Sequence, residues 1–287
     1  MHQFLKKSTI FTIVYIFFNY SLNYVDSKFY QNYKFDEGSV IFVGNSHTRS
    51  AINPKLISGS YNISLDAEPL IASFWKIKNI INNCGIDTII FGLSHVHLSA
   101  LIDDSFSASQ SAGEMFERYY SIIDIDFIDR VKFKLARYYY IYLKNMMLFY
   151  QNNHHEKYIG KYKPLDKKVV DFEKNINETI YKHYYKDNSN AAISQTSISY
   201  LDSIVNICHV NEVELIVVST PVHEKYYQKV PDKILNEYKF ITRSLVKRDV
   251  RVIDYSRLYK GNTLFADADH LSEEGSHEFT KLLKSIF

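Results

Sequence analysis

The stretch Ser39-Val40-Ile41-Phe42-Val43-Gly44, followed at once by the polar turn Asn45-Ser46-His47-Thr48, is the starting point for the expected fold. Short, nearly continuous runs of apolar and β-branched residues are typical of strands buried on both faces of a parallel sheet. Four more such runs follow, at residues 60–65, 87–92, 213–219 and 250–254. Helical patterns separate several of them, at residues 69–83, 197–209, 231–248 and 272–286. This alternation predicts a three-layer α/β/α sandwich with a mostly parallel five-stranded sheet.

A second polar cluster, Phe265-Ala266-Asp267-Ala268-Asp269-His270-Leu271, lies just before the last expected helix. A serine hydroxyl is a poor nucleophile unless an imidazole takes its proton and a carboxylate orients that imidazole. Asp267 and His270 are three residues apart, a spacing at which two side chains of a helical turn point the same way. A compact α/β fold could therefore bring Ser46 and this pair together. The simpler alternatives are that Ser46 caps a helix and that Asp267 and Asp269 are turn residues before a helix capped at Ser272.

These two clusters carry a family resemblance. Gly44-Asn45-Ser46-His47 resembles the first block of the SGNH (GDSL-like) hydrolases. Asp267-Ala268-Asp269-His270, followed by Leu271-Ser272-Glu273-Glu274-Gly275, resembles their last block. The resemblance implies a flavodoxin-like sandwich over residues 36–287. It also implies that Ser46 is the nucleophile, His270 the general base and Asp267 the residue that orients the imidazole.

The middle blocks depart from the family pattern. The second block usually has a glycine whose amide joins the oxyanion hole. Here Asn62-Ile63-Ser64-Leu65-Asp66-Ala67 has none, although an amide of Asp66 or Ala67 could serve. The third block usually reads Gly-x-Asn-Asp, whereas Gly92-Leu93-Ser94-His95 stands here, with Ser94 as a shorter donor and His95 as the next candidate. Asn45 is a further candidate for the oxyanion site or pocket. Since one lost donor costs roughly 2.7–4 kcal/mol, acyl transfer and slow, specialised ester hydrolysis both stay open.

Composition excludes some functions. The chain has 287 residues, of which 46% are hydrophobic and 23% charged, as in ordinary globular proteins. With a net charge of +2 and no dense basic stripe, we expect no nucleic-acid partner. Cys84 and Cys208 are too few for a disulfide framework or a cysteine metal site, and we expect two small buried hydrophobes. A single bridge between them stays open if the domain is exported.

Two histidines near the third block raise the question of a metal. His95 and His97 alternate along the end of a predicted strand, so they could share a metal with Asp66 or Glu68. Because no third ligand has a firm spacing, we expect no metal and no cofactor.

The N-terminus bears on location. Lys6 and Lys7 precede the apolar run 10–18, which is shorter than the ~20 residues of a full membrane span. Residues 1–26 are therefore predicted to be a signal-anchor or signal peptide. That interpretation places the domain on the membrane, facing the periplasm or cell exterior, or makes it secreted. The alternative is the N-terminal helix of a cytosolic fold.

Residues 100–196 do not fit a simple crossover between strands. Their pattern is helical and rich in tyrosine, including 131–150, and a polar stretch with His154 and His155 follows. We expect a helical insertion that is either a lid over the site or a packing or oligomer surface. Contact of the tyrosine-rich helix with a membrane interface is a further option.

The expected function is a serine-dependent ester hydrolase or O-acyltransferase that acts on an acylated small molecule or, by analogy, an acylated glycan of the cell envelope or surface. A transferase would need an acyl donor delivered by a membrane partner. The rival hypothesis is a catalytically weak or inactive relative that binds a glycan or a protein.

Overall fold

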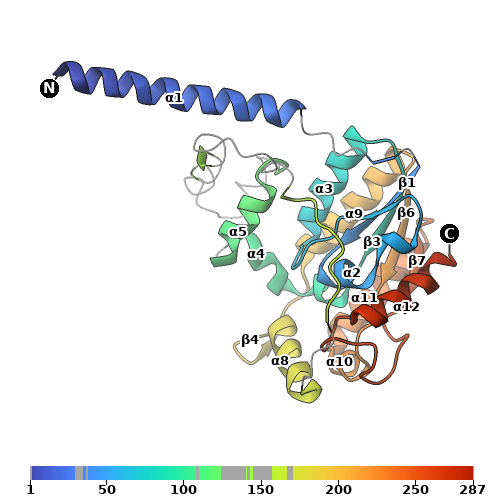
Figure 1. Cartoon of the computed structure of the whole chain (residues 1–287). Coiled ribbons are helices and arrows are strands. Elements are labelled where there is room, and N and C mark those ends of the chain that lie inside the picture. Colours follow the sequence, from blue (N-terminus) through green and yellow to red (C-terminus); the bar gives the residue numbers. More distant parts are fainter. Residues whose placement is uncertain are drawn as a thin grey trace. The chain divides into compact units, whose positions relative to one another are not determined.

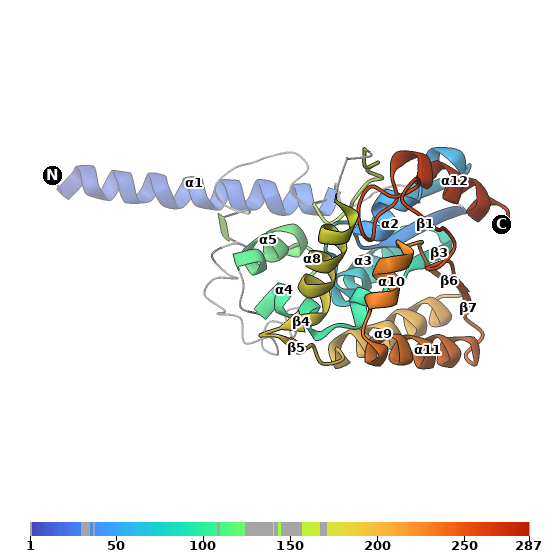
Figure 2. The same ribbon diagram turned by 90° about the horizontal axis from the view of Figure 1, so that it is seen from below.

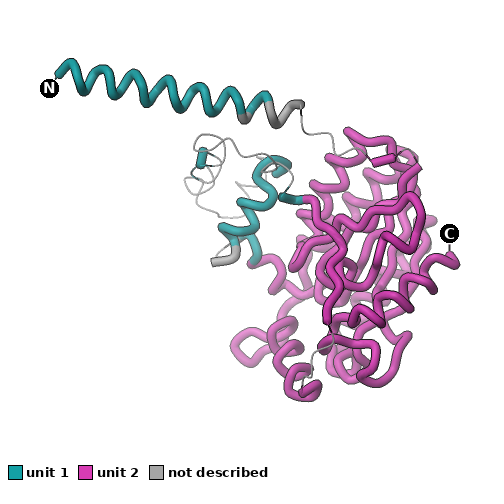
Figure 3. Tube along the Cα trace, in the orientation of Figure 1, with its two compact units in different colours: residues 1–34, 105–158 teal, residues 35–104, 159–287 magenta. Residues whose placement is uncertain are grey.

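A computed structural model of the chain describes residues 2–29, 35–36, 38–107, 110–123, 140, 143–144, 157–166 and 171–286. The chain forms two compact units (Figure 3). Unit 1 comprises residues 1–34 and 105–158, and unit 2 comprises residues 35–104 and 159–287.

Unit 2 contains a five-stranded parallel sheet (Figure 1). Its strands are β1 (Ser39–Gly44), β2 (Ser60–Asn62), β3 (Ile86–Gly92), β6 (Glu214–Ser219) and β7 (Arg251–Asp254). They lie in the order β2-β1-β3-β6-β7, and every neighbouring pair is parallel. The order reverses between β1 and β3, and in open α/β sheets ligands bind outside the carboxyl ends of the strands at such a point. The sheet confirms the predicted fold class.

Helices cover both faces of this sheet (Figures 1 and 2). One face carries α2 (Ser46–Ala51) and α12 (Glu273–Lys284), which pack against each other. The other face carries α3 (Leu70–Asn83), α9 (Gln195–Val210) and α11 (Asp232–Val246). Helices α3, α9, α11 and α12 match the four predicted helices to within two residues at each end. The short helix α2 is additional to these four.

The strands are apolar throughout because both faces are buried. Phe42, Ile90 and Val218 pack with Phe279 and Leu283 of α12 in one core cluster. The residues between them in the strands, such as Ile41, Ile89 and Val217, are buried as well. The strand predicted over 60–65 ends at Asn62, yet Ile63 and Leu65 still donate backbone hydrogen bonds to Phe42 and Gly44 of β1, at 3.0 and 3.1 Å. The chain therefore stays hydrogen-bonded to β1 as far as Leu65, the end of the predicted range, although the strand itself ends at Asn62.

Unit 2 also contains elements that the sequence did not resolve. They are α8 (Phe172–Tyr184), the hairpin β4 (Tyr185–Lys186) and β5 (Ser189–Asn190), α10 (Glu224–Lys229) and the 3-10 turns Pro54–Leu56, His95–Leu98 and Ala100–Asp103. The turn His95–Leu98 replaces the strand end that was predicted there. Helix α8 falls within the predicted insertion 100–196.

Unit 1 is largely helical in its described residues. It contains α1 (His2–Phe29), most of α4 (Asp104–Ser107) and α5 (Gln110–Tyr119), and Phe106 packs against Phe116 and Tyr119. Most of residues 131–150, together with His154 and His155, lies outside the described residues. That residues 100–196 act as a lid stays a prediction.

At the predicted segment 1–26, residues 2–29 form the single helix α1. Among the described residues, no helix combines the length and the apolar character needed to cross a membrane.

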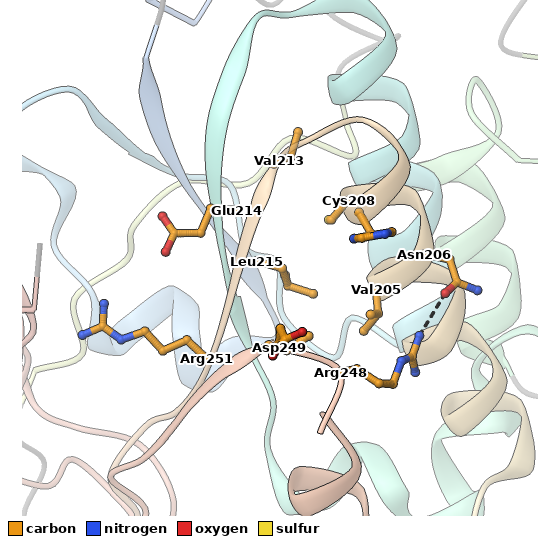
Figure 4. A pocket seen from close by; sticks show the side chains of 11 residues that line it. Val205, Asn206, Cys208, Val213, Glu214, Leu215, Arg248, Asp249 and Arg251 are labelled. Carbon is orange, nitrogen blue, oxygen red and sulfur yellow. Dashed lines mark hydrogen bonds between the residues drawn. The ribbon is translucent and has the colours of Figure 1, made fainter. Parts of the chain in front are cut away.

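Both cysteines are free thiols. Cys208 is buried, and burial raises the pKa of its thiol to about 12. It lines a hollow of about 340 Å³ together with Glu214 at the start of β6 and Arg251 at the start of β7 (Figure 4). Because Ser46 follows the carboxyl end of β1, this hollow lies at the opposite edge of the sheet. Cys84 ends α3 and is only half-buried.

Two glycines allow α2 to approach the strand ends closely. A Cβ at Gly44 would lie 2.3 Å from Oγ1 of Thr48, and a Cβ at Gly92 would lie 1.7 Å from the same atom. Thr48 belongs to α2, which begins with Ser46. The position of Ser46 therefore depends on the absence of side chains at the ends of β1 and β3.

We expect Gly92→Ala to lower the free energy of unfolding by about 1–3 kcal/mol, because the added methyl group overpacks the site against Thr48. Gly85→Ala is the matched control, since its Cβ would meet no atom within 4 Å, and it should change stability by less than about 0.5 kcal/mol. Urea unfolding followed by circular dichroism measures both. Adding Thr48→Ala to Gly92→Ala should recover part of the loss, and equal losses in the two glycine variants would contradict this account.

Candidate active site

Ser46 stands where β1 turns into α2. The N-cap of α2 is Asn45, whose side-chain Oδ1 accepts a hydrogen bond from the backbone N–H of His47 at 3.1 Å. The capping role considered for Ser46 therefore belongs to its neighbour. Ser46 is the first residue of the helix, at the carboxyl edge of the sheet, and its hydroxyl is available for another partner.

A tight turn brings Asp267 and His270 together. Oδ1 of Asp267 accepts hydrogen bonds from the backbone N–H groups of Asp269 and His270, at 3.1 and 2.9 Å. Ser272 then caps α12 by accepting from the N–H of Gly275 at 3.2 Å. The spacing of three residues works here through an Asx turn closed by the Asp267 side chain rather than through a helix.

The loop is also tied to its surroundings. Asn175 of α8 accepts a hydrogen bond from the N–H of Ala268 at 2.8 Å. His223, which caps α10, donates its own backbone N–H to the carbonyl of Ala268 at 3.2 Å, and its Nε2 lies 2.8 Å from Oδ1 of Asn262. The histidine after β6 thus supports the loop.

Ser46, His270 and Asp267 lie in hydrogen-bonding contact. Nε2 of His270 is 2.8 Å from Oγ of Ser46. Nδ1 of the same ring is 3.0 and 3.1 Å from the two carboxylate oxygens of Asp267. These contacts suit a ring that donates its Nδ1–H to the carboxylate and accepts the serine proton at Nε2. The side chains of His270 and Asp267 are 18% and 33% exposed, so the group is open to solvent on one side.

A second carboxylate, Asp269, faces the same imidazole. Its side chain is only 3% exposed, and Oδ1 lies 3.2 Å from Nδ1 of His270. Oδ2 lies 3.1 Å from Nε2 of His47 and 3.7 Å from Nδ1 of His183, which belongs to α8. Oδ2 has no hydrogen bond of good geometry, so its attraction to the His47 ring is electrostatic.

The charges of this cluster follow from its contacts. Burial by itself would lower the pKa of His270, but Asp269 and Asp267 outweigh burial and raise this pKa well above 6.5. Burial would likewise raise the pKa of Asp269, yet His270 and His47 hold it well below its usual range. His183 differs, because burial lowers its pKa to about 4 and keeps the ring neutral near pH 7.

Two of the predicted oxyanion residues meet beside Ser46. Nδ2 of Asn45 donates a hydrogen bond of 2.9 Å to Oγ of Ser94. Ser94 is buried two residues after β3, and its Oγ also lies 3.2 Å from Nδ1 of His97. The serine that replaces the family's asparagine therefore orients the amide of Asn45, which comes from the first block.

The other three residues predicted for the oxyanion site or pocket are Asp66, Ala67 and His95, and their surroundings differ from those of Asn45 and Ser94. Asp66 pairs with the guanidinium of Arg49, and its carboxylate is half exposed. Ala67 adopts a left-handed backbone conformation, with φ of 53°. His95 lies in an aromatic cluster, with its ring centroid 4.3 Å from that of Tyr238 and 5.4 Å from that of Tyr227. Its described contacts include neither Ser46 nor Asn45, and burial lowers its pKa to about 4.

A buried polar network joins the second and third blocks. Nδ1 of His97 accepts from the N–H of Ser94 at 3.1 Å, so its proton is on Nε2, which donates to the carbonyl of Glu68 at 3.2 Å. Burial lowers the pKa of His97 to about 3. Glu68 and Lys76 form a fully buried ion pair, and Lys76 also donates to the carbonyl of Ile63 at 2.7 Å. His95 and His97 are thus held by different partners and do not form the metal pair considered from their spacing.

Among the described residues, one group of three could hold a metal ion. His47, Asp269 and His270 offer ligand atoms within 4.8 Å of one another. The Nδ1 atom of His270 faces both Asp267 and Asp269, whereas Nε2 faces Ser46. A metal bound at Nδ1 would displace Asp267 from the ring, so metal binding there and the serine–histidine–aspartate arrangement exclude each other.

Sequence reasoning named His47 and Asp269 without giving them roles at the site, and it missed His183. The sequence did contain a signal for His47 and Asp269, because each is the direct neighbour of a predicted catalytic residue: His47 follows Ser46, and Asp269 precedes His270. His183 gave no signal, since it lies 87 residues before His270 in the segment that was expected to be an insertion.

Comparisons with known proteins give fold likenesses only. No family model matches the chain, and neither does any curated protein. A structure of a candidate acylhydrolase from Bacteroides fragilis is 12% identical, with a TM-score of 0.45, and the match covers 88% of this chain and 86% of that one. A GDSL-like lipase from Bacteroides thetaiotaomicron is 11% identical, with a TM-score of 0.43 and 86% of both chains covered.

A candidate platelet activating factor from Streptococcus pneumoniae is 12% identical, with a TM-score of 0.42, over 100% of this chain and 99% of that one. With TM-scores below 0.5, these likenesses carry no argument, and the account of the site rests on the contacts described above.

The network beneath the site gives a stability prediction. We expect Lys76→Met to lower the free energy of unfolding by about 3–5 kcal/mol, because it leaves the buried Glu68 without its cation. Glu68→Gln combined with Lys76→Met should lose less. The control Lys186→Met breaks an exposed pair with Asp104 and should cost less than about 0.5 kcal/mol. Urea unfolding at pH 7 measures these differences, and a cost for Lys76→Met equal to that of the control would refute the role of the pair.

Proposed function

We propose that the protein is a serine-dependent ester hydrolase or O-acyltransferase in which Ser46 is the nucleophile, His270 the general base and Asp267 the residue that orients the imidazole. The observation that supports this most is the 2.8 Å contact between Oγ of Ser46 and Nε2 of His270, continued to Asp267 at 3.0 Å. A nucleophile, a base and an orienting carboxylate in sequence are the requirements for acyl chemistry on serine.

The reaction proceeds in two halves. Oγ of Ser46 attacks the ester carbonyl carbon while Nε2 of His270 takes the hydroxyl proton. The tetrahedral intermediate collapses when His270 returns this proton to the leaving alcohol, which leaves an acyl group on Ser46. In the second half, water or an acceptor hydroxyl attacks the acyl carbon, again losing its proton to His270. Ser46 regains its proton as the acid or the new ester leaves.

The oxyanion needs donors that are already in place. The backbone N–H of Ser46 and the side chain of Asn45 are the proposed donors, with Ser94 fixing the orientation of Asn45 through their 2.9 Å hydrogen bond. The sequence departures in the middle blocks support keeping acyl transfer beside hydrolysis. An acylated glycan, named on the family resemblance alone, is the substrate class to assay first beside small acyl esters. For transfer, a membrane protein that delivers the acyl group is the proposed partner.

A fluorophosphonate probe tests the proposed nucleophile in the full chain. We expect the probe to label the wild type and not to label Ser46→Ala. Labelling of His270→Ala should be slower than that of the wild type by a factor of roughly 10³ or more. The control His277→Ala, on the exposed side of α12, should be labelled like the wild type, and a chelator should leave labelling unchanged. Circular dichroism verifies folding. A folded wild type that does not react would refute the proposal and favour the glycan- or protein-binding alternative.

A further inference from the structure

Two carboxylates face one nitrogen of His270. Asp267 approaches Nδ1 at 3.0 and 3.1 Å, and Asp269 approaches the same atom at 3.2 Å. Nδ1 carries a single proton, and the arrangement proposed above needs one carboxylate to orient it. The second carboxylate is therefore surplus to the simple serine–histidine–aspartate scheme and calls for its own explanation.

Asp269 is buried at this position at a cost. An ionised carboxylate taken out of water loses several kcal/mol of solvation unless cationic or hydrogen-bonding groups compensate it. Its compensating neighbours are His270 on its own loop and His47 at the start of α2, and the neutral ring of His183, at the end of α8, lies 3.7 Å from Oδ2. The fold thus places three imidazole rings around the Asp269 carboxylate, and one of them is the proposed base, His270.

The outer neighbours hold this arrangement in place. Nδ1 of His183 lies 2.8 Å from the hydroxyl of Tyr226, which in turn lies 3.1 Å from the hydroxyl of Tyr184. Burial raises the pKa of Tyr226 well above its ordinary value, so its hydroxyl keeps its proton. The two tyrosines and His183 therefore form a neutral wall on one side of Asp269.

We propose that Asp269 is a positioning residue that forms, with Asp267, a carboxylate pair on Nδ1 of His270, stabilises the imidazolium of the acyl-transfer step and retains much of that effect when Asp267 loses its charge. This inference rests on the proposed function. When the proton of Ser46 reaches Nε2, the new positive charge lies between two negative charges, one of them shielded from water. The same attraction holds a proton on the resting ring, so the base form becomes available only as the pH rises.

Activity tests separate a carboxylate pair from a single carboxylate. An aspartate-to-asparagine change at the orienting position of such a site costs roughly 10⁴ in kcat when that carboxylate acts alone. We expect Asp267→Asn to lose at least ten-fold less than this, because Asp269 still faces Nδ1, and the amide oxygen can keep the Asx turn. The double variant Asp267→Asn/Asp269→Asn should lose the full amount. Asp249→Asn is the control, since this exposed residue lies in a left-handed turn that asparagine tolerates.

The pH profile gives a readout that a merely structural role would not move. The groups that face His270 are Ser46 and His47 from α2, His183 from α8, and Asp267 and Asp269 from its own loop. Because carboxylates favour the charged ring, removing one makes deprotonation easier. We expect the acid limb of kcat/KM for a small acyl ester to move to lower pH in Asp269→Asn, while Asp249→Asn leaves it unchanged.

A third measurement does not depend on catalysis. Titration of His270 by NMR in ¹³C-histidine-labelled Ser46→Ala, assigned with His270→Gln, should show a midpoint above 6.5 that moves to lower pH when Asp269→Asn is added. If the wild type is inert toward the probe but this shift is seen, the proposed function fails and the charge coupling stands.

If Asp269→Asn does not fold, Asp267→Asn decides, because it should keep a His270 midpoint above 6.5 and should lose at least ten-fold less activity than the roughly 10⁴ expected for a single carboxylate. Two results overturn the inference. One is an unmoved His270 midpoint in Asp269→Asn, and the other is a loss in Asp267→Asn as large as in the double variant.

Discussion

The contact between Ser46 and His270 is the interaction on which the rest of the site depends. It joins residues 224 positions apart at a distance of 2.8 Å. Two strand ends, one short helix and one loop must all be placed to within about 0.5 Å for this contact to form. The parallel sheet supplies the coarse placement, because its first strand and its last loop end at the same edge. Gly44, Gly92 and the Asx turn at Asp267 supply the fine placement.

The buried polar residues beneath the carboxyl edge of the sheet also help to position the site. Glu68, Lys76 and His97 are fully buried, which is costly for charged and polar groups unless each has partners. Each of the three bonds to the backbone or a side chain of another element, so the loop after β2 and the turn after β3 are fixed to α3. An apolar core would stabilise these loops as well, but it would not fix where their backbone amides point.

The sequence was sufficient for those features that repeat or that lie close together along the chain. Buried strands could be located because both faces are covered, which makes β1 and β6 apolar throughout. Asp267 and His270 could be paired because they share one turn. It was insufficient where distant segments meet. Asp269 was visible, yet nothing in its neighbourhood along the chain indicates that His47 and His183 approach it. The surroundings of His95 were hidden for the same reason, since its aromatic neighbours Tyr227 and Tyr238 come from α10 and α11.

The cluster around Asp269 also draws on an element outside the sheet. The buried carboxylate has its electrostatic partners in His270 and His47, while the neutral ring of His183 beside it comes from α8, outside the five-stranded sheet and its covering helices. The segment that contains α8 therefore holds the loop 265–271 through Asn175 and places the His183 ring against the buried Asp269. Under the proposed function, α8 helps to position the carboxylate that faces the base, although α8 itself carries none of the proposed catalytic groups. The reactivity of Ser46 is then a property of the whole carboxyl edge of the sheet rather than of three residues alone.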